Sequence, residues 1–76
     1  MNNARRKRIR DAAEQMEQLK GEIESILEDE EEYMDNIPEN MQGSERYETA
    51  ETACENLQSA VDAMEEVLSS LEEAQN

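Results

Sequence analysis

The chain has 76 residues, with 21 acidic and seven basic side chains, one Cys, one Pro, no His, Phe or Trp, and a formal charge of −14. A chain this short forms one domain over residues 1–76, and that domain buries too little apolar surface to be stable unless a disulfide, a metal or a partner chain supports it. One cysteine excludes an internal disulfide, and a single Cys with no His excludes the ordinary zinc sites. We therefore expect support from another chain.

The same composition limits location and chemistry. No segment reaches the roughly 18 consecutive apolar residues of a membrane span, and no apolar stretch follows the basic start as in a secretory signal, so we expect a cytoplasmic protein. Without His, the Ser/His/Asp and Cys/His arrangements cannot form, and the chain has no glycine-rich phosphate loop. We expect a protein that is not an enzyme and holds no metal or cofactor.

The first ten residues contain five bases and no acid. These bases form a candidate basic arm: Arg5, Arg6, Lys7, Arg8 and Arg10. In one interpretation the arm pairs with acids near the end of a second, antiparallel helix, namely Glu65, Glu66, Glu72 and Glu73. In the other it binds nucleic acid or an anionic lipid surface, but no aromatic residue accompanies it for base stacking and the acidic body repels a polyanion. We favour the first interpretation and do not expect direct nucleic-acid binding.

From Ile9 onward, apolar residues recur three and four positions apart, which predicts an amphipathic helix over about 4–36. With Ile9 as position a of a heptad, residues at a and d form a stripe that residues at e widen. Its members are Ile9, Ala12, Ala13, Met16, Leu19, Ile23, Ile26, Leu27, Tyr33, Met34 and Ile37. Glu30 interrupts the stripe at an a position, where polar residues often specify register or oligomeric state.

Residues 37–44 contain the only Pro and one of the two Gly, and they are predicted to form a loop. The first helix should end near Asn36, because the residue before Pro38 is disfavoured in the α region. Ser44 is a suitable N-cap for a second helix over about 45–74.

In this second helix, with Tyr47 as position a, apolar residues occupy every a and d position. They are Tyr47, Ala50, Cys54, Leu57, Val61, Met64, Leu68 and Leu71. The g positions extend the stripe on one side with Ala53, Ala60, Val67 and Ala74. Cys54 lies within this stripe, where a free cysteine usually behaves as a small apolar residue.

The fold class predicted from these patterns is all-α: an antiparallel, coiled-coil-like two-helix hairpin. Both stripes are three residues wide, so one hairpin would leave an apolar surface in water. We expect a homodimer that forms a four-helix bundle, or else a different partner chain that completes the bundle. The predicted interface residues are Ile9, Met16, Leu19, Ile23, Ile26, Leu27, Tyr33, Met34, Tyr47, Leu57, Val61, Met64, Val67, Leu68 and Leu71.

Two functions are compatible with these features. The first is a protein–protein assembly module that acts through the apolar stripes. The second is an acidic mimic of nucleic acid that inhibits a nucleic-acid-binding protein, because residues 11–76 carry a net charge of −19. That is one charge per roughly 2.4 Å of helix length, against about 1.7 Å for duplex DNA. The candidate acidic surface consists of Glu48, Glu55, Asp62 and Glu66.

The basic start, the segment from Asp35 to Arg46 and the repetitive helix after it together resemble a group of short, acidic bacterial proteins of unknown function that are associated with prophages and mobile elements. This resemblance covers most of the chain, and the loop segment is its specific part. It implies a helical hairpin and a phage or mobile-element setting. It implies no catalytic or binding residues.

Overall fold

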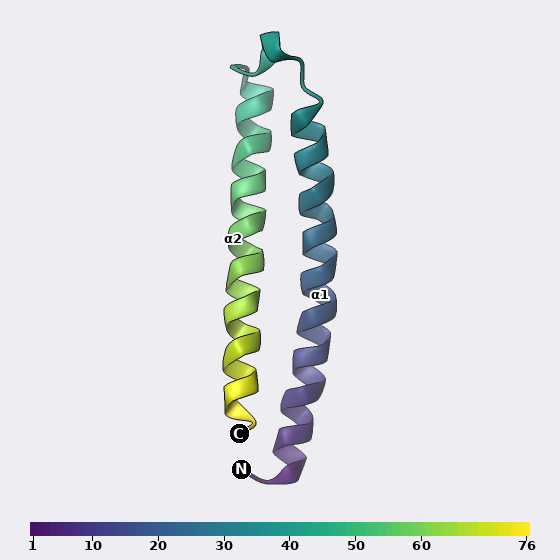
Figure 1. The fold of residues 1–76 in the computed structure, drawn as a ribbon, viewed down its shortest axis with the longest axis vertical. Coiled ribbons are helices and arrows are strands. Elements are labelled where there is room, and N and C mark those ends of the chain that lie inside the picture. The colour runs from purple at the N-terminus through teal and green to yellow at the C-terminus, as the bar shows by residue number, and fades with distance from the viewer.

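The computed structural model describes residues 1–76 as two long helices joined by a short loop (Figure 1). Helix α1 spans Asn3–Asp35 and helix α2 spans Glu45–Ala74, with a short 3-10 helix, η1, at Glu39–Met41. The two helices lie side by side and antiparallel, so both chain termini meet at one end, called here the open end, opposite the loop. The molecule is 59 Å long and 15 by 13 Å across. This confirms the predicted all-α hairpin.

Polar caps determine where both helices begin. The Asn2 side chain accepts a hydrogen bond from the Arg5 amide at 2.8 Å, so α1 starts slightly before the expected residue 4. The Ser44 hydroxyl accepts one from the Tyr47 amide at 3.3 Å, as expected for an N-cap. Helix α1 ends at Asp35, two residues before the Ile that precedes Pro38.

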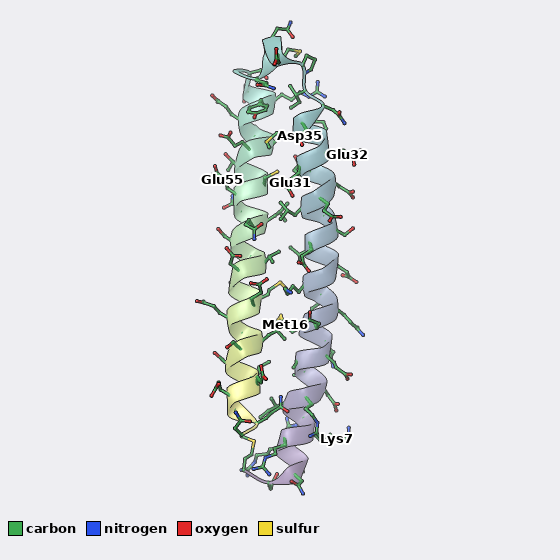
Figure 2. All side chains as sticks on the ribbon, viewed as in Figure 1. Lys7, Met16, Glu31, Glu32, Asp35 and Glu55 are labelled. Atoms are coloured by element: carbon green, nitrogen blue, oxygen red, sulfur yellow. The ribbon has the colours of Figure 1, made fainter.

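The helices contact each other along a narrow seam. Four residues are buried in it: Leu27, Ile37, Ala50 and Val61. Half-buried residues continue the seam in both directions: Arg6, Ile9, Ala13, Met16, Lys20, Ile23, Glu30 and Met34 from α1, and Tyr47, Cys54, Leu57, Met64, Leu68, Leu71 and Gln75 from α2. Figure 2 shows Met16 between the helices, whereas Glu32 and Glu55 point away from the seam. The seam residues of each helix recur three and four apart, as in a coiled coil.

The seam uses only part of each predicted stripe. On α2 it consists of positions a and d, whereas on α1 it consists of positions a and e. The d positions of α1, which belong to the same predicted stripe, lie outside the seam of the single hairpin, since Leu19, Ile26 and Tyr33 are 51%, 50% and 41% exposed. The physical reason is that a with e gives the same three-and-four spacing as a with d, and α1 presents the a and e residues to α2.

Candidate interaction surface

Apart from Arg5 and Arg46, the d positions of α1 and the g positions of α2 carry apolar side chains that the hairpin leaves uncovered. We call these residues the apolar ribbon: Ala12, Leu19, Ile26 and Tyr33 from α1, and Ala53, Ala60, Val67 and Ala74 from α2. All are exposed except Ala53, which is half-buried. Because each set repeats every seven residues, each forms a line that runs along its helix beside the seam.

A contact near the loop shows that both lines lie on the same face of the hairpin. Arg46, at position g of α2, donates a hydrogen bond from Nε to the Tyr33 hydroxyl at 2.5 Å. Its guanidinium carbon also lies 5.1 Å from the centroid of the Tyr33 ring, within range of a cation–π interaction. Tyr33 is at position d of α1, so the d line of α1 and the g line of α2 are neighbours across the seam.

An ion pair identifies the opposite face. Lys20 is half-buried in the seam at position e of α1, and its Nζ lies 3.8 Å from a carboxylate oxygen of Glu65, at position e of α2. The same ammonium lies 3.7 Å from Glu17 and 3.9 Å from Glu24. From Ile9 onward, Lys20 is the one polar residue among the e positions of α1, and the acids three residues before it and four residues after it are the sequence signal for its role. The charged contact across the seam therefore lies on the side away from the ribbon.

Acidic side chains are excluded from the part of α2 that borders the ribbon. The acids of α2 all occupy positions b, e or f: Glu45, Glu48, Glu51, Glu55, Asp62, Glu65, Glu66, Glu72 and Glu73. Next to the ribbon, the c positions hold small or neutral residues: Thr49, Asn56, Ala63 and Ser70. In a chain with 21 acids, this leaves one side of α2 free of negative charge along its whole length. Small side chains there allow another helix to approach closely.

The ribbon face has a groove at the open end of the hairpin. The groove has a volume of about 320 Å³ and is lined by Met1, Arg5, Arg8, Ile9, Ala12 and Leu71. The side chains of Arg5 and Arg8 form no ion pair or hydrogen bond within the chain, in contrast to Lys7, which pairs with Asp11 at 2.9 Å. The groove thus combines an apolar lining with two unpaired positive charges.

The candidate basic arm forms the first turns of α1, and its contacts differ from the expected ones. No ion pair joins it to the acids near the end of α2. Instead, Arg6 Nε donates a hydrogen bond to the main-chain oxygen of Gln75 at 3.0 Å. Glu65 pairs with Lys20, and Glu66, Glu72 and Glu73 are exposed, whereas Arg6 lies in the seam and reaches the end of the α2 backbone. A cation at a helix C-terminus interacts favourably with the helix dipole.

The candidate acidic surface lies away from the ribbon. Glu48, Glu55 and Asp62 are all at position b of α2, Glu66 is at position f, and all four are exposed. The Asp62 carboxylate accepts a hydrogen bond from the Gln58 amide at 3.0 Å, and none of the four forms an ion pair. These acids line the outer edge of α2.

Cys54 provides a local test of the seam. Burial, followed by the nearby carboxylates of Glu30, Glu31 and Asp35, raises the pKa of the Cys54 thiol. We expect the folded protein to react with Ellman's reagent at pH 8 more slowly than the urea-unfolded protein, because the thiolate is the reactive form. A raised pKa also means that the neutral thiol stabilises the fold below the ordinary thiol pKa and that this contribution is lost as the pH rises through the raised value. Equal rates in the two states would contradict the seam position.

Neither a metal site, a membrane span nor a known relative assigns a function to the chain. No group of three or more His, Cys, Asp or Glu side chains is arranged to hold a metal ion. Neither helix combines the length and the apolar character needed to cross a membrane. No family model, curated protein or solved structure matches the chain. The resemblance to prophage-associated proteins therefore stays a prediction.

Proposed function

We propose that this protein is a non-enzymatic assembly module that uses the apolar ribbon to pack against two further helices, completing a four-helix bundle as a homodimer. The observation that carries this proposal is the ribbon itself, which runs along one face and borders an acid-free side of α2. In a chain so rich in acids, positions that stay exposed to water are expected to include charged residues. Apolar and small residues at all of them indicate a surface that is covered by protein.

The energetics of the single hairpin support the same conclusion. Only four of its residues are buried, and none of the large side chains is fully buried. Leu19, Ile26 and Val67 remain 40–51% exposed. Covering the exposed half of each of these side chains would contribute about 1 kcal/mol, and a symmetric dimer gains each contribution twice. Burial of the ribbon therefore adds substantially to a core that is small for an independent domain.

The alternative proposal, mimicry of nucleic acid, receives less support from the geometry. On the outer edge of α2, Glu48, Glu55 and Asp62 are seven residues apart, which corresponds to about 10.5 Å along the helix. Phosphates of one DNA strand advance only about 3.4 Å along the duplex axis. These acids therefore do not reproduce the spacing of a phosphate backbone, and we favour assembly.

Reversal of the candidate acidic surface tests whether assembly depends on the apolar ribbon or on these acids. In a variant with Glu48→Lys, Glu55→Lys, Asp62→Lys and Glu66→Lys, we expect the dimer to persist at twice 8.8 kDa in sedimentation equilibrium. The dimer should also tighten, because each copy changes from a charge of −14 to −6 and the two copies repel each other less. Loss of the dimer with retained helical content would show that these acids form the interface and would contradict the assembly role of the ribbon.

A further inference from the structure

We propose that the two copies in this bundle lie head to tail, with their loops at opposite ends and with Tyr33 of each copy seated in the open-end groove of the other. This inference rests on the assembly function proposed above and specifies how the second copy covers the ribbon. The distribution of charge, the register of the ribbon and the chemistry of its two ends support it.

Symmetry leaves two ways to stack the ribbon faces of identical hairpins. If the two-fold axis runs parallel to the helices, both loops lie at the same end and α1 packs on α2 of the other copy. If the axis is perpendicular to the helices, the loops lie at opposite ends and each helix packs antiparallel on its own counterpart. The two arrangements differ in whether the loop end of one copy lies against the loop end or against the open end of the other copy.

Charge favours the second arrangement. The half of the hairpin near the loop, residues 21–57, contains 13 acids and only one base, a net charge of −12. The open half, residues 1–20 and 58–76, contains eight acids and six bases, a net charge of −2. Loops at the same end bring the two −12 halves together, whereas loops at opposite ends set each −12 half against a −2 half. Coulomb repulsion scales with the product of the charges. Summed over both pairs of facing halves, the repulsion is about threefold weaker in the head-to-tail arrangement.

The register of the ribbon fits an axis that passes beside Leu19. The d positions of α1 are spaced evenly about this residue, so a perpendicular axis there pairs Ala12 with Ile26 and position 5 with position 33. Ala60 is the corresponding centre of the g positions of α2. It lies at nearly the same height, because residues whose numbers add up to about 80 face each other across the seam, as Ile9 and Leu71 do in the groove. One axis therefore serves both lines of the ribbon.

The two ends of the ribbon are complementary in chemistry. At the loop end, the exposed Tyr33 ring has the Arg46 guanidinium beside it and the acids Asp29 and Glu30 within the preceding turn. At the open end, the groove offers apolar walls together with the unpaired cations of Arg5 and Arg8. A perpendicular axis at Leu19 places the ring over this groove, where a guanidinium can stack on it, and brings Asp29 to the level of Arg8 of the other copy. Each of these contacts occurs twice in the dimer.

Distances between spin labels at the loop test the orientation. Gln42→Cys places a nitroxide on an exposed loop residue in a Cys54→Ala background, whose helical content is checked by circular dichroism. For head-to-tail copies, double electron–electron resonance should give a distance on the order of the 59 Å length of the hairpin. A distance of roughly 20 Å, as expected for packed helices 8–10 Å apart with loops at the same end, would overturn the orientation and leave the assembly function intact. Absence of dipolar coupling together with the mass of a single chain would instead overturn the assembly function.

A charge-reversal series tests the individual contact. We expect Arg8→Glu to weaken the dimer about tenfold, because it places two carboxylates together at both ends of the interface, and we expect a second change, Asp29→Arg, to restore the affinity. Arg10→Glu is the matched control, because it makes the same change in net charge at the open end but lies in a groove on the opposite face, beside Glu72. Equal losses for Arg8→Glu and Arg10→Glu, without rescue by Asp29→Arg, would overturn the proposed contact.

Discussion

Replacement of Leu19 by Asp is expected to convert the dimer into a folded single hairpin. Leu19 is 51% exposed in the hairpin, so a carboxylate at this position remains hydrated while the chain is alone. In the proposed dimer the same position is covered, and burial of an unpaired carboxylate costs several kcal/mol. In the proposed head-to-tail arrangement the two copies of the substitution also lie close together. We expect the dissociation constant to rise by at least about 100-fold, as measured by sedimentation equilibrium.

The matched control for this change is Ser59→Asp. Ser59 is exposed at position f of α2, away from both the seam and the ribbon, so the substitution adds the same charge without entering an interface. We expect the control to change the dissociation constant by less than about threefold, as is usual for exposed charges. Equal effects of the two substitutions would mean that net charge, and not the position of Leu19, controls association.

Truncation of Leu27 to Ala is expected to destabilise the hairpin itself by about 2–3 kcal/mol, because removal of a buried Leu side chain loses transfer free energy and leaves a cavity. Leu27 is the only buried residue of α1 and is 8% exposed. A loss of this size is a large fraction of the stability of a small domain. Urea unfolding followed by circular dichroism should therefore show a much lower transition midpoint, accompanied by weaker association.

Gly21→Ala is a control substitution that is expected to increase the stability of the hairpin. A methyl group on Gly21 meets no atom within 4 Å, so it strains nothing. Ala is more favourable than Gly in a helix by about 1 kcal/mol, and we expect the midpoint to rise. A Leu27→Ala variant as stable as the unmodified protein would contradict the seam, because it would place Leu27 outside the contact between the helices.

Much of the fold follows from local sequence signals. The three-and-four spacing of apolar residues predicts both helices, and Pro38 and Ser44 predict the break between them. The short loop then requires the helices to be antiparallel neighbours. The cap at Asn2 is not among the predicted features, although Asn is one of the preferred residues for that position.

The division of the apolar residues between seam and ribbon could not be predicted from spacing. On α1, residues at a combine equally well with those at d or those at e, and both pairs give a coiled-coil stripe. The d set includes Leu19, Ile26 and Tyr33, which are as apolar as the e set, and Lys20 at e argues against the choice that the structure makes. In the structure Lys20 lies in the seam and its ammonium reaches Glu65 across it, a contact between residues far apart in sequence.

This division changes how the predicted interface residues are understood. Ile9, Leu57, Val61 and Leu71 hold the hairpin together, so their substitution would unfold the chain before it tests any assembly. Leu19, Ile26, Tyr33 and Val67 are available to another chain. The sequence identified both groups as one apolar set, and only the structure separates the residues that maintain the fold from those that the proposed function uses.

The solution mass of the unmodified protein tests the central claim most directly. Light scattering over a concentration series, with circular dichroism of the same samples, measures association and helical content together. We predict a helical species of twice 8.8 kDa that persists in high salt, because burial of the apolar ribbon, and not attraction between opposite charges, provides most of its stability. A fully helical species of 8.8 kDa at every concentration would contradict the account, because the ribbon would then be stable in water without a second copy.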